Sequence, residues 1–260
     1  MLTNTARRAA LEEARRWFRA PDRAPIYDAF QAVYLSPPRT LFLEVALHQL
    51  GRAPRRVLDV GCGTGEALGY LVDRLPDAEI VGVDPEPEML LRATARTGGK
   101  CELRRATLDD EGDDLGTFDL ILSYSTFRFW DHPAAALRRA SSLLCPGGLA
   151  CIQDLRRDMD EELRSQLLQP METPELRGFL AAQIDSAYSI PEVRQIIEDA
   201  SIKGCALGVG GLAGLPERSP GAFAMIQHNE RLLQLLLQLS SGGFRVARGN
   251  ESVFHLSVRG

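Results

Sequence analysis

Val57-Leu58-Asp59-Val60-Gly61-Cys62-Gly63-Thr64-Gly65-Glu66 is the stretch that decides the fold. The apolar run at 55–60, RRVLDV, predicts a buried strand, and the amphipathic run at 66–75, EALGYLVDRL, predicts a helix. The three glycines between them permit a tight turn and let a ligand approach the backbone closely. A glycine-rich turn that joins a strand to a helix is typical of nucleotide-binding loops. The sequence therefore predicts such a loop from Asp59 to Gly65.

An acidic residue follows the second expected strand. Asp84 lies nineteen residues beyond Gly65, directly after the apolar run at 79–83. A carboxylate at this place can accept two hydrogen bonds from the ribose hydroxyls of a nucleoside. Asp59, at the end of the first strand, can meet an ammonium group at the same edge of the sheet. The alternative is a tight turn beside a solvated aspartate, but strand, loop, helix, strand and acid in this order favour a binding site.

Outward from the loop, strands and helices alternate. Further strands are expected at 79–83, 100–105, 118–123 and 149–154, with helices at 87–96 and 133–144. This alternation predicts an α/β fold, a Rossmann-like doubly wound sheet with helices on both faces. Helices are also expected at 5–19, 36–50, 156–187, 192–200 and 223–239. The last residues, FRVARGNESVFHLSVRG at 244–260, predict two strands around Gly249-Asn250, and the glycine-rich segment 204–214 is a second candidate for the sixth strand.

Composition bounds the class of protein. With 260 residues and 45% hydrophobic residues, the chain can form one α/β domain with added helices. Its net charge of -5 argues against a general nucleic-acid binder, which needs a basic surface. The five cysteines form no C-x-x-C pair and the four histidines show no ligand spacing, so neither a disulfide framework nor a metal site is expected. Without a signal-peptide pattern or a long apolar run, we expect a cytoplasmic protein that does not enter a membrane.

Four segments resemble one known family. VLDVGCGTGE at 57–66 looks like the first motif of class I S-adenosylmethionine-dependent methyltransferases, and VGVDPEPEML at 81–90 looks like their acidic second motif. FDLILSYS at 118–125 and LLCPGGLACIQDL at 143–155 resemble the fourth strand and the turn into the fifth. The resemblance covers residues 55–155. It implies a seven-stranded sheet whose last two strands form a hairpin, with S-adenosylmethionine as cofactor, S-adenosylhomocysteine as product, and a small-molecule acceptor methylated on O, N or C.

The resemblance also implies a cofactor-binding set. Residues of the glycine loop would surround the methionine part, and Asp84 would hold the ribose. Pro85 and Met89 would lie near the adenine. The family usually has an acid and a small apolar residue after the third strand; here Thr107-Leu108 stand there, so Asp109 is the candidate for the adenine amino group and Leu108 for covering the ring. The expected set is Asp59, Gly61, Cys62, Gly63, Gly65, Asp84, Pro85, Met89, Thr107, Leu108, Asp109 and Ser123.

Four residues are candidates for the acceptor side. The segment after the fourth strand lacks the Asn/Asp-Pro-Pro-Tyr/Phe motif used on nucleic-acid bases, and lacks the histidines that many small-molecule members place there. Arg128 is either a clamp for an anionic acceptor or a surface arginine. Tyr27 resembles a tyrosine that folds over the cofactor in some members, or is a packed aromatic. Tyr124 and His132 complete the set, and His132 is alternatively a helix cap.

These patterns predict one methyltransferase domain over 1–260. It comprises an N-terminal helical lid at 1–53, a cofactor-binding core at 54–155, a helical insertion or substrate region at 156–240 and a C-terminal hairpin at 241–260. Leu232, Leu233, Leu236 and Leu239 could form a homodimer face. Two other readings stay open: a cyclisation-type enzyme or binding scaffold that keeps the cofactor, and a nicotinamide oxidoreductase. The second is less favoured because Glu66 stands where its G-x-G-x-x-G pattern needs glycine.

Overall fold

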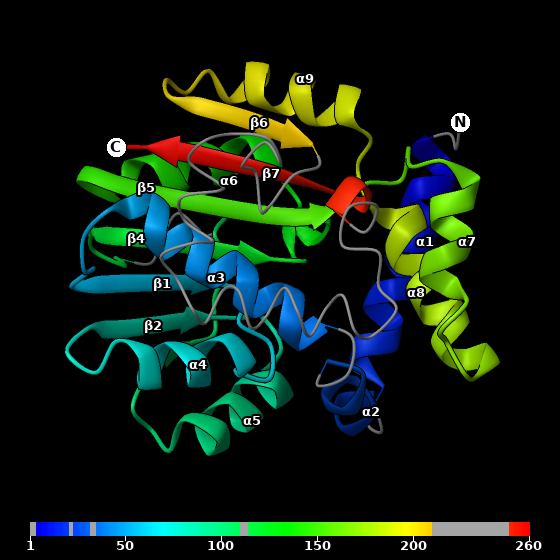
Figure 1. Cartoon of the computed structure of the whole chain (residues 1–260), viewed down its shortest axis with the longest axis horizontal. Helices are drawn as coiled ribbons and strands as arrows, with labels where there is room; N and C mark the ends of the chain where they lie inside the picture. The colour runs from blue at the N-terminus through cyan, green and yellow to red at the C-terminus, as the bar shows by residue number, and fades with distance from the viewer. Residues whose placement is uncertain (1–3, 21–22, 32–34, 110–113, 210–249) are drawn as a thin grey trace, which may run out of the picture.

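The computed structural model describes residues 4–20, 23–31, 35–109, 114–209 and 250–260. Its centre is a seven-stranded sheet in the order β3-β2-β1-β4-β5-β7-β6 (Figure 1). Strands β1 to β5 pair in parallel, while β7 runs antiparallel to both of its neighbours. The strands are β1 Arg56–Val60, β2 Glu79–Val83, β3 Glu102–Arg104, β4 Phe118–Tyr124, β5 Leu144–Leu155, β6 Cys205–Val209 and β7 Val253–Arg259.

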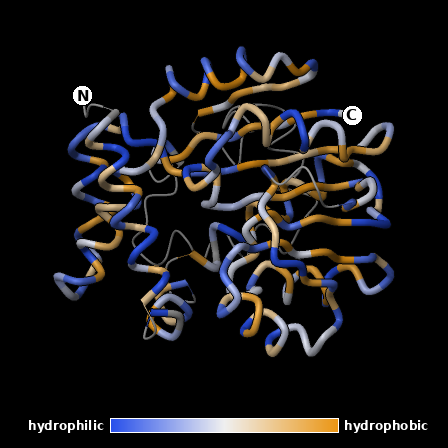
Figure 2. Tube along the Cα trace, turned by 180° about the vertical axis from the view of Figure 1, so that it is seen from behind, coloured by the Kyte–Doolittle hydropathy of each residue, from blue (hydrophilic) through white to orange (hydrophobic). Residues whose placement is uncertain are grey.

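Helices cover both faces of this sheet, as the alternation predicts. One apolar core joins alternate strand residues to helices α3 Ser36–Leu50, α4 Glu66–Arg74 and α5 Pro87–Thr97. A second core joins the other strand residues to α6 Pro133–Ser142 and α9 Ile190–Ala200. Hydrophobic segments accordingly concentrate in the strands, and hydrophilic ones in the surrounding turns (Figure 2). The doubly wound fold is thereby confirmed.

Four further helices lie together beyond the end of the sheet toward which β5 points (Figure 1). They are α1 Asn4–Arg19, α2 Arg23–Phe30, α7 Glu161–Leu168 and α8 Pro174–Ser186. Aromatic rings of α1, α2 and α8 pack edge to face, with Phe179 of α8 5.6 Å from Phe18 and 6.2 Å from Tyr27 between ring centres. Ligands of parallel α/β sheets bind at the carboxyl ends of the strands. These helices therefore border the edge where a ligand is expected.

The sixth strand lies in the glycine-rich segment. Cys205–Val209 forms β6 and pairs with β7 in a register that sets Gly208 opposite His255. The antiparallel pairing of the last two strands is confirmed, but Asn250, where the turn was expected, begins a short 3-10 helix, η3 Asn250–Ser252. The other candidate strand, Phe244–Arg248, and the expected helix at 223–239 lie outside the described residues. The turn prediction is wrong at Asn250 because β7 pairs with β5 and β6, which both lie far earlier in the chain.

The helix before the core begins one residue earlier than a helix capped by Ser36 would. Ser36 is the first residue of α3 rather than its cap, and Leu35 holds the N-cap position without a side-chain hydrogen bond. Gly51 ends this helix in the left-handed conformation, with φ of 74°, as predicted. In the part of the chain that the structure describes, no helix combines the length and the apolar character needed to cross a bilayer.

Candidate functional site

In the glycine loop between β1 and α4, two glycines pack closely against other residues and a third borders open space. A Cβ at Gly61 would lie 2.5 Å from a Thr126 side-chain carbon, and one at Gly65 would lie 2.7 Å from the Ala93 Cα. A Cβ at Gly63, whose φ is 54°, would meet nothing within 4 Å. Packing thus requires glycine at 61 and 65, whereas Gly63 borders space that a ligand can use.

Asp59 is a buried carboxylate with an unsatisfied oxygen. Its side chain ends β1 and is only 4% exposed, and its Oδ2 has no hydrogen-bond partner among the described residues. Burial raises the pKa of Asp59 to about 7, against the opposing charge of Arg39. A buried carboxylate without a partner is unfavourable, so this position is suited to an incoming ammonium group.

Asp84 is bonded into the same loop. Its Oδ2 accepts a hydrogen bond from the Gly63 backbone N–H, and its Oδ1 accepts one from the Glu86 backbone N–H, each at 2.9 Å. Burial raises the pKa of Asp84 to about 6, although these two bonds oppose the rise. Each oxygen keeps a second lone pair. The carboxylate is therefore fixed in position and can still accept hydrogen bonds from a ligand.

The residues expected around an adenine are divided between core and surface. Met89 and Leu108 are buried, whereas Pro85 is exposed and Thr107 is half-buried. Asp109 accepts a hydrogen bond from the His132 backbone N–H at 2.9 Å through Oδ2, while its Oδ1 is buried without a partner in the described part of the chain. Asp109 thus offers the unsatisfied acceptor that an adenine amino group needs.

Two predicted residues take part through packing. The thiol of Cys62 packs in the core, with its sulfur 3.0 Å from where a Cβ on Gly82 would lie, and burial raises its pKa. Ser123 is fully buried, and its hydroxyl lies 2.6 Å from that of Thr126, which donates to the Val60 carbonyl at 3.2 Å. Their side chains therefore hold β4 and the loop together, and Cys62 presents only backbone to the site.

Arg128 is a buried structural ion pair. Its guanidinium pairs with Asp154 of β5 and donates to the Gln183 side chain at 3.1 Å and to the Ser125 carbonyl at 3.0 Å. The Arg128 side chain is 4% exposed, and its backbone N–H also donates to Asp154. These contacts contradict both interpretations of Arg128 from the sequence, a clamp for an anionic acceptor and a surface arginine. Every nitrogen of its guanidinium donates a hydrogen bond to the protein.

The other acceptor-side candidates separate into two groups. Tyr27 of α2 and Tyr124 at the end of β4 share the charged neighbours Arg39 and Arg128, and burial raises the pKa of both hydroxyls. His132 is exposed and precedes α6, where its side chain makes no capping bond. The structure brings the two tyrosines together at the carboxyl edge and leaves His132 beside Asp109, bonded through its backbone.

Sequence reasoning missed two features here. Ser125 has φ of 62°, a left-handed conformation that is uncommon for residues other than glycine, directly after β4. Arg39 of α3 pairs with Glu66 and lies 5.4 Å from the centre of the Tyr124 ring. The one available signal was a charge inside the apolar segment SPPRTLFLEVAL at 36–47.

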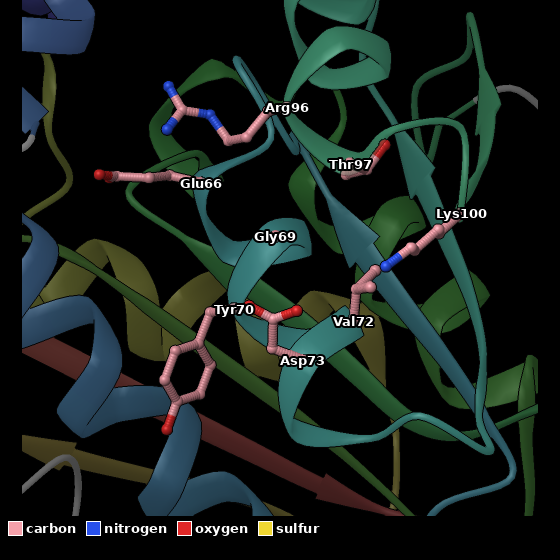
Figure 3. A pocket seen from close by; sticks show the side chains of 8 residues that line it. All are labelled: Glu66, Gly69, Tyr70, Val72, Asp73, Arg96, Thr97 and Lys100. Carbon is pink, nitrogen blue, oxygen red and sulfur yellow. The ribbon is translucent and has the colours of Figure 1, made fainter.

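A surface pocket of about 310 Å³ lies between α4 and α5 (Figure 3). Its lining carries both signs of charge, from Glu66 and Asp73 and from Arg96 and Lys100. Arg96 also donates to the Thr64 carbonyl at 3.0 Å and pairs with Asp28 of α2 at 2.9 Å. The pocket therefore backs onto the glycine loop from outside. Among the described residues, no cluster of histidine, cysteine and acidic side chains is arranged to hold a metal ion.

Comparison with known proteins points to one family. A family model described as a methyltransferase domain matches residues 58–150. The trans-aconitate 2-methyltransferase of Methylobacterium nodulans is 29% identical over 159 residues, which cover 60% of each chain. The malonyl-[acyl-carrier protein] O-methyltransferase of Dechloromonas aromatica is 35% identical over 144 residues, 54% of this chain and 50% of that protein. The chain thus spans about half to three-fifths of the length of these relatives.

A solved structure shares the whole fold. The plantazolicin methyltransferase BamL, in complex with a triazolic desmethylPZN analog and SAH, superimposes with a TM-score of 0.80 over 98% of this chain and 97% of that one, at 20% identity. The unsatisfied Asp59 oxygen and the space beside Gly63 fit S-adenosylmethionine, which carries an ammonium group and must approach the loop backbone. By its sheet and its glycine loop, the chain has the fold of the class I S-adenosylmethionine-dependent methyltransferases, and residues 58–150 match a methyltransferase domain.

Proposed function

We propose that this protein transfers the methyl group of S-adenosylmethionine to an oxygen, nitrogen or carbon atom of a small-molecule acceptor. The observation that carries the proposal is the buried, unpartnered carboxylate oxygen of Asp59 beneath a glycine loop that is open at Gly63. When bound, the cofactor supplies an electrophilic methyl group on a sulfonium. The chain's own contribution is to hold the two reactants in line.

The cofactor roles follow the contacts of each residue. Asp59 binds the ammonium group, and the backbone at Gly61 and Gly63 adjoins the methionine part. Asp84, held by the Gly63 and Glu86 N–H groups, accepts the ribose hydroxyls. The unsatisfied Oδ1 of Asp109 accepts the adenine amino group. Backbone of Cys62 and Gly65 shapes the loop, and the adenine neighbours are Pro85, Met89, Thr107 and Leu108.

The residues on the acceptor side position the acceptor and do not remove a proton from it. The pKa of Tyr27 and that of Tyr124 are both raised by burial, so each hydroxyl stays protonated at neutral pH and donates a hydrogen bond. A general base is needed only for poorly acidic nucleophiles. The site therefore suits an acceptor that is already nucleophilic at neutral pH, and a carboxylate or a weakly basic amine that is unprotonated at that pH fits better than an unactivated alcohol. Small molecules, not nucleic acids, are the proposed acceptors.

The N-terminal helices act as a lid over this site. Asp28 of α2 pairs with Arg92 at 3.3 Å and with Arg96 at 2.9 Å, both on α5. Arg19 of α1 pairs with Glu86 at 3.1 Å, two residues beyond Asp84. These pairs fasten residues of the proposed lid, 1–53, to the loops that hold the cofactor. Helix α8, in the segment 156–240, packs against α1 and α2 through the aromatic contacts of Phe179.

Location and assembly complete the proposal. All five cysteines are free, which agrees with a reducing compartment such as the cytoplasm. A homodimer through the leucines at 232–239 is also proposed, although those residues lie outside the described part of the chain. The core at 54–155 and the strand region at 241–260 complete the proposed single domain.

The direct test is to ask which cofactor the protein carries and consumes. Native mass spectrometry of the purified protein should find bound S-adenosylmethionine or S-adenosylhomocysteine. Incubation with S-adenosylmethionine and a library of small carboxylic acids and amines should release S-adenosylhomocysteine, and Asp59→Asn should abolish the release. Binding of NAD in place of either adenosyl ligand contradicts the proposal, and turnover without methylated product identifies a different reaction on the same fold.

A further inference from the structure

Gln183 of α8 has a buried side-chain amide of which only one end has a partner. The residue is 4% exposed, and its Oε1 accepts a hydrogen bond from the Arg128 Nε at 3.1 Å. An arginine side chain has donors only, so this contact fixes the orientation of the amide. The Gln183 Nε2 is left buried, without a hydrogen-bond partner among the described residues. A buried donor without an acceptor is unfavourable, so this position is suited to an oxygen of a bound molecule.

The neighbours of Gln183 locate this donor on the acceptor side of the site. Phe179 lies four residues before Gln183 and therefore on the same face of α8. The Phe179 ring is 6.2 Å from the ring of Tyr27 of α2. Arg128, which holds the amide, also donates at 3.0 Å to the carbonyl of Ser125, the first residue after β4. The Gln183 amide is therefore near the carboxyl end of β4, on the side of α8 that contacts α2.

Two tyrosine hydroxyls add further donors at this edge. Tyr27 and Tyr124 are both half-buried, and neither hydroxyl donates a hydrogen bond to a described residue. Burial raises the pKa of both hydroxyls, so they stay protonated, and the Arg128 charge acts on both. The Asp154 carboxylate at the end of β5 is engaged by Arg128. The acceptor side therefore offers amide and hydroxyl donors, while its carboxylate is already paired.

A carboxylate acceptor matches these donors, whereas an amine does not. One carboxylate oxygen can attack the methyl group while the other, attached to the same carbon, accepts a hydrogen bond from the Gln183 Nε2. An amine nitrogen uses its one lone pair in the attack, so none is left for this donor, and its own N–H groups need acceptors. In transfer to a carboxylate, an oxygen lone pair forms the new bond to the methyl carbon. The carbon–sulfur bond breaks with its electron pair left on sulfur, and no proton has to be removed.

We propose that the acceptor is a small carboxylic acid, bound as its carboxylate, and that Gln183 binds the oxygen that is not methylated. The inference rests on the proposed function, since it takes methyl transfer from S-adenosylmethionine as given. Half-buried rings of Phe18 and Phe129, with centres 5.8 Å apart, lie beside the Phe179 ring on the same side of α8. These rings favour an acid whose remainder is apolar. Gln183 is then the residue that distinguishes an acid from an amine of the same shape.

The first test pairs acids with amines of the same carbon skeleton. The protein is incubated with S-adenosylmethionine and a library of apolar carboxylic acids, such as benzoate, phenylacetate and cinnamate, beside aniline, benzylamine and the other matching amines. Mass spectrometry should find methyl esters of acids. Methylated amines without any ester, or no ester from any acid, overturn the proposal and leave the cofactor assignment standing. Wild-type protein that binds neither S-adenosylmethionine nor S-adenosylhomocysteine overturns the proposed function itself.

The second test removes the Gln183 donor in two ways. Gln183→Met keeps the length of the side chain and should lower kcat/KM for the best acid by roughly 10-fold to 100-fold, the range for a lost hydrogen bond to a charged group. Gln183→Glu keeps an oxygen for Arg128 but turns an anionic oxygen toward the acid, and should lower kcat/KM at least as much. Both should bind S-adenosylhomocysteine within about threefold of wild type. Gln169→Glu is the matched control, the same change at an exposed glutamine after α7. Wild-type kcat/KM in both Gln183 variants, or equal losses for acid and S-adenosylhomocysteine, overturns the proposal.

Discussion

Asp84 accepts a hydrogen bond from the Gly63 backbone N–H at 2.9 Å, and this bond joins the end of β2 to the loop after β1. Its second oxygen accepts from Glu86 N–H, where the chain turns into α5. The carboxylate therefore does two things: it shapes the loop and presents acceptors to a ligand.

Asp84→Ala should weaken S-adenosylhomocysteine binding by about 2–4 kcal/mol, because two hydrogen bonds to a charged acceptor are lost and water replaces them in part. Isothermal titration calorimetry measures this difference. Asp84→Asn should cost less, since its one remaining oxygen can still accept. Unchanged affinity in a folded Asp84→Ala protein removes this residue from the proposed ribose role.

Substitutions at Gly63 and Gly65 should have different effects: the first should change ligand binding and the second should change the stability of the fold. Gly63→Val adds a branched side chain to open space, so S-adenosylhomocysteine binding should be lost while the protein stays folded, at a cost of about 1–2 kcal/mol for the positive φ. Gly65→Ala places its Cβ against the Ala93 backbone at 2.7 Å and should lower the melting temperature instead. Calorimetry and thermal unfolding of both variants check this contrast. A folded Gly63→Val protein with normal affinity would show that the ligand does not approach the loop there.

Asp59 should make both stability and binding depend on pH. Its pKa is about 7 in the folded protein against an ordinary 3.8, so the folded state retains a proton that the unfolded chain releases between about pH 4 and pH 7. Stability should therefore fall as pH rises through this window and level off above it. Asp59→Asn removes the effect and should be more stable than wild type at about pH 8 in the absence of ligand.

Ligand binding should show the opposite dependence. An ammonium group needs the ionised carboxylate, so the affinity of wild type for S-adenosylhomocysteine should fall as pH drops below about 7. Titrations in buffers with different ionisation enthalpies should detect proton release near that pH. If Asp59→Asn keeps the same proton release, the titrating group is another one, and Asp84, with a pKa of about 6, is the next to test.

Arg128→Ala should destabilise the fold by about 3–5 kcal/mol, because it leaves the buried Asp154 carboxylate without its cation. Urea denaturation followed by circular dichroism measures the loss. Arg138→Ala, at an exposed position on α6, should stay within about 0.5 kcal/mol of wild type. Full stability with a raised acceptor KM would restore Arg128 as a direct acceptor ligand.

Local patterns explain what could be predicted. A parallel strand buried on both faces is a short apolar run, so VLDV and FDLIL identified β1 and β4, and the glycine loop between β1 and α4 located Asp59 and Asp84. Features that depend on contacts between distant parts of the sequence could not be predicted. β6 is a short, half-exposed edge strand in a glycine-rich segment, and only its register with β7 defines it. Likewise, Asp154, the ion-pair partner of Arg128, lies on β5, and Arg39 contacts the glycine loop from α3, a helix before the core.

The place of β7 in the sheet has a consequence for synthesis. β5, whose residues from 148 to 154 are buried, pairs with β7, and β7 in turn supports β6, yet residues 253–259 leave the ribosome after both of these strands. Until then the nascent chain carries an apolar strand with an open edge, which is a template for aggregation. A translational stall after residue 209, or a nonsense codon before 253, should thus yield an insoluble product that depends on chaperones, even though every residue of the proposed cofactor site has already been made.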